Sequence, residues 1–183
     1  MPAAACRAPL PGPERHWRAS REQAVLTELP PGARAGFQGL RFYPFDASYR
    51  FRAMLEPVEP PQPLRLAVSS GTQRPAHRVG RLRLRMPAGD ALLSVYLLDD
   101  LSAELPEHLF LPFRDAVAGS ETYGAGRYVD VERLAGGVVA IDFNRAYNPD
   151  CAYGISAQCP ITPVENTVPF AVRAGEMTPP GHP

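Results

Sequence analysis

The chain contains no lysine, and all nineteen of its basic residues are arginine. Without lysine there is no Schiff-base chemistry, no phosphate loop of the Walker type and no serine–lysine dyad. Nineteen acidic residues bring the net charge to zero, so no global charge attracts nucleic acid or an anionic membrane. No apolar run approaches the roughly 20 residues that a membrane span requires. We therefore expect neither a nucleic-acid partner nor membrane association.

Cysteine is scarce as well. Three cysteines are too few for a disulfide-based scaffold. Residues 1–13 lack the apolar core of a signal peptide. These two features predict a cytoplasmic protein, because thiols stay reduced in that compartment.

Proline is abundant and shapes the expected fold. The 183 residues suffice for one domain with a real core, and 22 prolines are about twice the average usage. Proline at that density breaks helices, so a β architecture is favoured. We expect a disordered tail over residues 1–12, a single domain over residues 13–176 and a flexible tail over residues 177–183.

One helix is predicted near the N-terminus. Trp17, Val25 and Leu29 are spaced for one helical face over residues 14–29, and prolines at 30 and 31 stop the helix. Trp17 is interpreted as a packing anchor rather than a ligand platform.

Short strands are predicted to follow the helix. Alternating apolar and polar residues predict strands at 40–45, 49–55, 64–68, 79–86, 92–98, 109–113, 127–131, 138–143 and 168–172. The proline-rich stretch 57–63 reads as a loop. The fold class is mostly β: a single antiparallel barrel or sandwich of about eight strands with one N-terminal helix.

The arginines concentrate in residues 41–85, which carry nine of them against three acidic residues. Residues 86–183 carry five arginines against thirteen acids, so the two parts are expected to face each other in one fold. Arg81, Arg83 and Arg85 alternate with leucines and share one sheet face. A half-buried face is the preferred interpretation of this ribbon, and capture of an anionic ligand is the alternative.

Polar, aromatic and turn-forming residues crowd into residues 110–170. The stretch 144–166 is too rich in turn-forming residues for regular structure, and loops of that length in a compact domain are usually functional or disordered. Its aromatic content argues against disorder. We expect it to lie over one end of the sheet.

Several motifs of this region form one signature. They are Arg-Asp at 114–115, Glu-Thr-Tyr-Gly-Ala-Gly-Arg-Tyr at 121–128, Asp-Phe-Asn-Arg-Ala-Tyr-Asn-Pro-Asp-Cys-Ala-Tyr at 142–153, Cys-Pro at 159–160 and Glu-Asn at 165–166. With these motifs the chain resembles family 1684 of the domains of unknown function (DUF1684), over roughly residues 14–176. The resemblance implies no activity, because the family has no established one. The residues themselves must therefore indicate the chemistry.

Glu121 and Asp142 are the candidate catalytic carboxylates, since a carboxylate can act as general acid or base. If the two lay close together, the pKa of one would rise. Arg114, Arg127 and Arg145 offer the alternative of structural ion pairs, which is the preferred interpretation for either carboxylate.

The remaining polar residues have structural alternatives too. Tyrosines 123, 128 and 147 offer hydroxyl donors or pack in the core. Asn144 and Asn148 are expected to tie loop backbone together. Cys151 and Cys159 are separated by seven residues, which is not a zinc-knuckle spacing. Two packed thiols are the default interpretation, and a disulfide, a Cys/His metal site or a nucleophile pair of Cys151 with His77 are alternatives.

The leading hypothesis is a small-molecule-binding domain, with no cofactor and no metal. The residues expected to line its polar pocket are Arg114, Glu121, Tyr123, Arg127, Asp142, Asn144 and Tyr147. One alternative is an interaction or scaffold module, in which the same residues only hold the long loop in place. The other is a metal-free hydrolase that uses Glu121 or Asp142. The ligand, the presence of catalysis and the oligomeric state stay open.

Overall fold

The computed structural model describes residues 10–180, so most of the predicted N-terminal tail and residues 181–183 lie outside the described part. Helix α1 spans Gly12–Glu28, with proline in its first turn, and Leu29 caps its end by donating its N–H to Val25. The predicted helix is thereby confirmed. A single further turn, α2, spans Pro31–Arg34. Within residues 10–180 no helix combines the length and the hydrophobicity of a membrane span.

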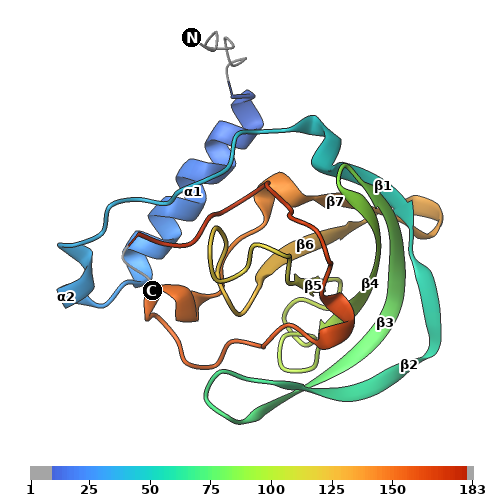
Figure 1. The fold of residues 1–183 in the computed structure, drawn as a ribbon. Coiled ribbons are helices and arrows are strands. Elements are labelled where there is room, and N and C mark those ends of the chain that lie inside the picture. The colour runs from blue at the N-terminus through green and yellow to red at the C-terminus, as the bar shows by residue number, and fades with distance from the viewer. Residues whose placement is uncertain (1–9, 181–183) are drawn as a thin grey trace, which may run out of the picture.

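The fold is mostly β, as predicted. The strands are β1 Arg50–Met54, β2 Glu56–Ala67, β3 Gln73–Met86, β4 Gly89–Leu98, β5 Leu109–Phe113, β6 Arg127–Arg133 and β7 Val138–Asp142. They form one antiparallel sheet in the order β1-β7-β6-β5-β4-β3-β2. The sheet curls into a half-barrel (Figure 1).

The curl follows from the connection between β1 and β2. These strands are consecutive in the chain, yet they lie at opposite edges of the sheet. The chain between them bends at Leu55, which packs onto Gly80 of β3. A Cβ atom at Gly80 would lie 2.6 Å from Leu55 Cδ1 and 2.9 Å from the backbone carbonyl oxygen of Glu56, so this close approach requires glycine.

The hydrophobic core fills the inner face of the curled sheet. Leu82, Leu93, Leu111 and Ile141 from four different strands are at most 2 % exposed. The C-terminal segment 168–174 completes this core with three buried residues. It crosses the open side of the half-barrel, drawn in red in Figure 1. The mouth of the barrel is therefore filled by the protein's own chain.

Three local predictions are wrong. Residues 40–45 and 168–172 form no strand, and Phe42 makes only an isolated bridge with Glu176. The proline-rich stretch 57–63 belongs to β2 instead of a loop. Proline is tolerated there because β2 is an edge strand and its register with β3 shifts between Pro57 and Gln62.

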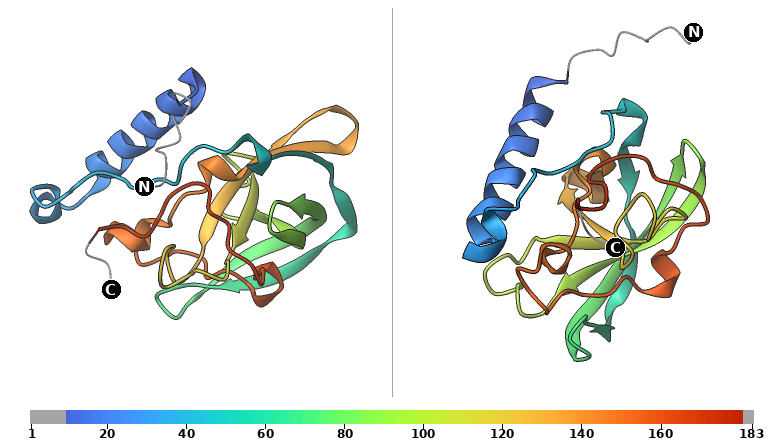
Figure 2. Two further views of the ribbon diagram at one scale, coloured as in Figure 1. Left: turned by 45° about the horizontal axis from the view of Figure 1, so that its top comes forward. Right: turned by 60° about the vertical axis from the view of Figure 1, so that its left-hand side comes forward.

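The outer face of the sheet is divided into two halves. An apolar half over one end of β3–β5 contains a second buried cluster with Tyr96, Leu98 and Phe110, whereas the exposed arginines 81, 83 and 85 lie farther along β3. A charged half lies over β1, β7 and β6, whose outward positions carry the charged side chains Arg50, Arg52, Asp130, Glu132 and Asp142. Helix α1 runs outside the sheet, beside the segment that follows β7 (Figures 1 and 2).

Candidate functional site

Arg127 of the second motif is buried in the interior, with 1 % of its surface exposed. Its guanidinium donates hydrogen bonds to the carbonyl oxygens of residues 172, 174 and 176. It also lies 3.5 Å from the carboxylate of Asp115. Burial lowers the pKa of Arg127, whereas the charge of Asp115 raises it. Arg127 thus holds the C-terminal segment in the mouth of the barrel.

Asp115 of the first motif supports the same segment. Its carboxylate accepts a 2.6 Å hydrogen bond from Thr122 Oγ1 and a 2.9 Å bond from the Val172 N–H. Asp115 is 3 % exposed. Every contact of this carboxylate is therefore internal to the fold.

Asn166 occupies a gap between two strands. β4 and β5 pair at one position only, Tyr96 with Phe110. Beyond that position the side chain of Asn166 accepts from the Ser94 N–H at 2.7 Å and donates to the carbonyl oxygens of Ser94 and Pro112. Its amide replaces the missing ladder hydrogen bonds.

Asn144 fixes the chain that leads into β1. Its side chain bonds both backbone groups of Asp46 at 2.8 Å and donates to Asp142 Oδ1. Asp142 also accepts a 2.8 Å bond from Arg50 Nε, and Arg145 Nε lies 4.0 Å away. The fully buried Asn144 has no surface for a ligand.

Glu121 lies at the surface and pairs with an arginine that was not among the predicted partners. Its carboxylate pairs with both the Nε and the Nη2 of Arg173, at 2.8 Å and 2.6 Å, and accepts a hydrogen bond from Tyr43. These donors lower the pKa of Glu121 to about 2. Glu121 and Asp142 share no hydrogen-bond or ion-pair partner among residues 10–180.

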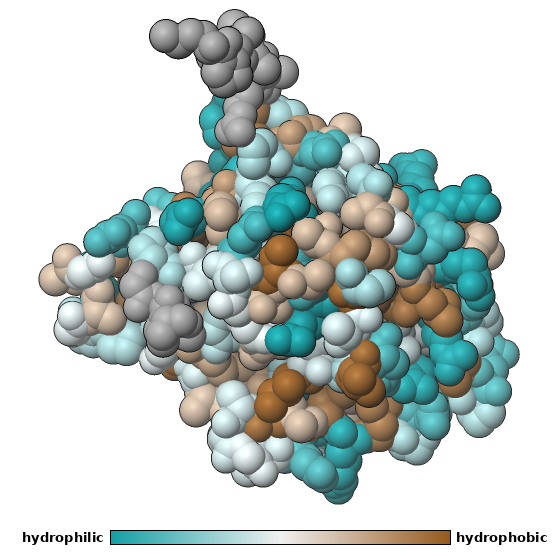
Figure 3. Space-filling model, viewed as in Figure 1, coloured by the Kyte–Doolittle hydropathy of each residue, from teal (hydrophilic) through white to brown (hydrophobic). Residues whose placement is uncertain are grey.

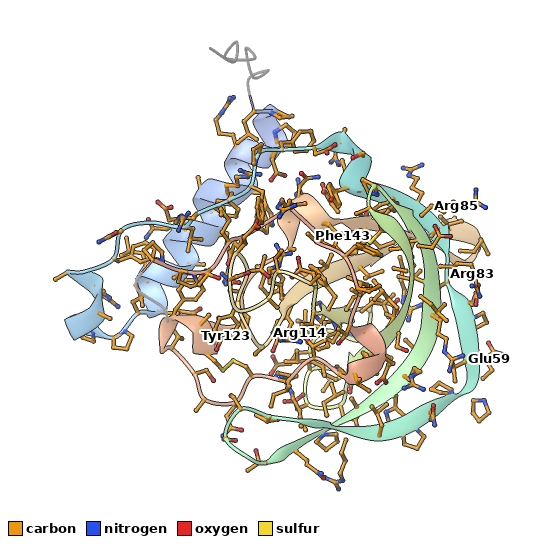
Figure 4. All side chains as sticks on the ribbon, in the orientation of Figure 1. Glu59, Arg83, Arg85, Arg114, Tyr123 and Phe143 are labelled. Atoms are coloured by element: carbon orange, nitrogen blue, oxygen red, sulfur yellow. A yellow bond between two sulfur atoms is a disulfide. The ribbon has the colours of Figure 1, made fainter. Side chains whose placement is uncertain are left out.

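Arg114 and Tyr123 lie on and beside the turn that follows β5. Arg114 Nε donates to the carbonyl oxygen of Gly124 at 2.9 Å. Figure 4 shows both side chains near the front of the molecule, in the region of the loop between β5 and β6. Phe143, labelled in the same view, is fully buried in the core.

Tyr147 lies on the outer face, where its hydroxyl donates to Asp130 at 3.0 Å. The next residue, Asn148, uses its backbone N–H to reach the carboxylate of Glu176. Glu176 is fully buried and also accepts from Tyr153 and Arg21. These contacts join the long loop, the C-terminal segment and α1.

The loop is closed by a disulfide between Cys151 and Cys159, whose Cα atoms are 6.2 Å apart. The interpretation as two packed thiols is therefore wrong. Both sulfurs are engaged, and within residues 10–180 no three histidine, cysteine or acidic side chains gather as metal ligands.

A polar cleft of about 550 Å³ lies on the charged half of the outer face. We call it the Trp17 cleft. The polar and aromatic side chains that line it are Trp17, Arg50, Arg52, Asp130, Glu132, Asp142 and Arg145. The floor is Ala140 of β7, which leaves room because its side chain is a single methyl group.

The predicted pocket is thus distributed over the molecule. Of the seven predicted residues, Asp142 lines the Trp17 cleft, and Tyr147 contacts its wall through Asp130. Asn144 lies behind Asp142. Arg114, Glu121, Tyr123 and Arg127 lie elsewhere and do not line it.

Trp17, which was interpreted as a packing anchor, lines this cleft, and Arg52 and Glu132 were not among the predicted site residues. The alternation of arginines at 50 and 52 already marked the polar face of the predicted strand 49–55. Which acidic side chains faced them depended on the order of the strands, which no local pattern reveals.

Comparison with known proteins agrees with the resemblance. Residues 35–177 match the family described as "Protein of unknown function (DUF1684)". The chain is similar to an uncharacterized protein from gene locus rrnAC0354 of Haloarcula marismortui, whose structure was solved by solution NMR. The identity is 30 %, the match covers 92 % of this chain and 94 % of that chain, and the TM-score is 0.69. No curated protein matches. This chain therefore belongs to the DUF1684 family, whose function is unknown.

Proposed function

We propose that this protein binds a small zwitterionic molecule, an α-amino acid or a short peptide, in the Trp17 cleft. One observation carries the proposal. Arg52 and Glu132 lie on either side of Ala140, on the floor of an open cleft, and within residues 10–180 neither side chain has a hydrogen bond or an ion pair. Two unpaired opposite charges that flank a cleft suit a ligand that carries both charges.

The register of the sheet sets the spacing of the two charges. Arg52 of β1 is opposite Ala140 of β7, and Glu132 of β6 is opposite Ala140 on its other side. Two strand spacings put their Cα atoms about 10 Å apart. Both side chains are long enough to reach a ligand above the alanine methyl group.

Further arginines favour a carboxylate on the ligand. Arg50 binds Asp142 through Nε, and Arg145 faces Glu14 through Nε at 3.4 Å. Among the described residues the terminal nitrogens of both guanidiniums have no hydrogen-bond partner. Arginine binds carboxylates in a bidentate manner through such free edges. The indole ring of Trp17 offers apolar contact for the body of the ligand.

Thermal stability measured against a matched ligand series tests the proposal. Leucine carries both charges, N-acetylleucine only the carboxylate and leucine amide only the ammonium. A ligand at a hundred times its Kd stabilises the folded protein by about 2.7 kcal/mol. We expect stabilisation by leucine or a leucine dipeptide and much less by the two singly charged derivatives.

Matched variants place the effect in the cleft. Arg52→Gln and Glu132→Gln each remove one of the two charges, and we expect them to abolish most of the ligand-induced shift. Arg81→Gln and Glu59→Gln make the same changes at exposed positions outside the cleft and serve as controls. Equal stabilisation of all four variants, or no stabilisation of the wild type, refutes the proposal.

The hydrolase alternative has less support. With a pKa of about 2, Glu121 stays ionised near neutral pH and is a weak proton acceptor. Asp142 shares its carboxylate between Arg50 and Asn144. Retained turnover of any hydrolysed substrate in Glu121→Gln and Asp142→Asn would eliminate this alternative.

The scaffold alternative is favoured by the internal contacts of Arg127, Asn144 and Asn166, which hold loops together. Its working surface would be the arginine ribbon of β3. Arg83 and Arg85 point away from the sheet in Figure 4, and hydrophilic groups gather along the edge formed by β2 and β3 in Figure 3. A triple Arg81/Arg83/Arg85→Gln variant that keeps all cellular interactions of the wild type would remove this candidate.

The cytoplasmic location stays a prediction, and the loop disulfide offers a test. In the cytoplasm Cys151 and Cys159 would be kept reduced. Alkylation in freshly quenched cells followed by mass spectrometry reports their state. Free thiols support the cytoplasm, and an intact disulfide contradicts it.

A further inference from the structure

A second cleft, of about 610 Å³, lies on the apolar half of the outer face, beneath the long loop. We call it the aromatic cleft. Its walls include Leu98, Phe110, Tyr128 and Tyr147, with Arg74 and Asp150 on its polar side. Its volume falls within the range of small-molecule sites, and its mixture of apolar walls and a few polar groups is typical of them.

The three aromatic rings form a corner. The Phe110 and Tyr128 ring centroids are 4.7 Å apart at an interplanar angle of 70°. The Tyr128 and Tyr147 centroids are 5.8 Å apart at 90°. Faces of aromatic rings carry negative potential and attract cations. The Arg21 guanidinium, 5.1 Å from the centroid of Tyr147, already makes such a contact.

The charged groups that line the aromatic cleft also favour a cation. Arg74 is neutralised by Asp100, whose two carboxylate oxygens lie 3.0 Å and 2.9 Å from its Nε. The carboxylate of Asp150 has no hydrogen bond or ion pair among residues 10–180. Burial raises the pKa of Tyr128, the charge of Arg74 lowers it and the charge of Asp150 raises it, so both charged groups act on this ring. The aromatic cleft thus has, beside three aromatic rings, a carboxylate that lacks a hydrogen bond or ion pair within residues 10–180 and interacts with the charge of Arg21 only at longer range.

We propose that the aromatic cleft is a second binding site and that it takes a small organic cation, an ammonium group attached to an apolar body. The ammonium lies between the rings and Asp150, and the apolar body covers Leu98 and Phe110. This site is separate from the Trp17 cleft: Tyr147 lines the aromatic cleft, Asp130 lines the Trp17 cleft, and their hydrogen bond joins the two walls.

Calorimetric titration with benzyltrimethylammonium tests this site. Benzyl alcohol and benzoate have the same ring with no charge and with a negative charge. We expect the cation to bind at millimolar or lower concentration, and the alcohol about fivefold more weakly or worse, since a cation–π contact with a nearby charge contributes at that level. Equal affinity for the cation and the alcohol, or no binding of the cation, overturns the proposal.

Variants locate the binding. Asp150→Asn is expected to weaken binding of the cation about fivefold, whereas Asp90→Asn makes the same change at an exposed position outside the cleft and leaves the affinity unchanged. Arg52→Gln, which disables the Trp17 cleft, must also leave this affinity unchanged. An Asp150→Asn protein that binds the cation as tightly as the wild type refutes the site.

Discussion

Replacing Arg127 by methionine tests whether the second motif is structural. Methionine has a similar length but makes none of the three hydrogen bonds to the C-terminal segment. It also leaves Asp115 buried without a counter-charge, since only 2 % of that side chain is exposed. Removing one partner of a buried ion pair costs about 3–5 kcal/mol.

The loss would be large for a protein of this size. Natural domains are stable by about 5–15 kcal/mol. A loss of 3–5 kcal/mol corresponds to a fall in Tm of about 6–20 °C for a chain of this length. Chemical denaturation gives the free energy of unfolding directly. Hydrogen exchange should show that the backbone N–H groups of residues 172–177 lose protection first, because Arg127 holds that segment.

A double variant separates charge from packing. Arg127→Met combined with Asp115→Asn removes the unpaired charge, so its loss should be smaller than the sum of the two single losses by at least about 1 kcal/mol. Arg81→Met, at an exposed position, is the matched control and should change stability little. Destabilisation below about 1 kcal/mol in Arg127→Met, with residues 172–177 still protected, would refute this reasoning.

Three further predictions concern Glu121 and Asn166 of the motifs and Glu176 of the C-terminal segment. Glu121→Gln removes the ion pair with Arg173, and the loss of stability should be small because the pair is exposed. The pKa of Glu121 is lowered from 4.5 to about 2 in the folded protein, so the pair stabilises the fold above pH 4.5. The difference in unfolding free energy between wild type and variant should therefore vanish as the pH falls to 2. Asn166→Ala leaves three buried backbone groups without partners and should cost about 2–4 kcal/mol in urea unfolding. Asn166→Asp should cost at least as much near neutral pH, because its buried carboxylate cannot donate and faces the carbonyl oxygens of Ser94 and Pro112. Glu176→Gln removes the charge that pairs with Arg21, so hydrogen exchange in α1 should accelerate while the sheet stays protected; unchanged exchange in α1 would show that this pair does not hold the helix.

Much of the fold is predictable from local patterns. Proline in the first turn and the apolar spacing from Trp17 to Leu29 give the helix, and alternation gives most strands. The errors arise in segments whose structure depends on which other segment they pair with. Residues 40–45 alternate like a strand but bond only with the C-terminal segment, and the prolines of β2 are accepted because one edge of that strand is unpaired.

The candidate site was less predictable. Both carboxylates pair with arginines as expected, and the predicted Arg145 lies 4.0 Å from Asp142. The closest arginines, however, are Arg173 for Glu121 and Arg50 for Asp142. Arg173 reaches Glu121 because the C-terminal segment crosses the mouth of the barrel, and Arg50 reaches Asp142 because β1 pairs with β7. Both contacts are long-range consequences of topology.

The Trp17 cleft can be observed directly, because Trp17 is the single tryptophan of the chain and lines the cleft. Its fluorescence, followed during titration with the non-fluorescent ligands leucine and leucine dipeptide, therefore reports on this site. We expect a saturable change in the wild type and in Arg81→Gln, and none in Arg52→Gln. A flat signal for the wild type up to millimolar ligand, or the same curve for Arg52→Gln, would contradict the assignment of the Trp17 cleft as a site for zwitterionic molecules.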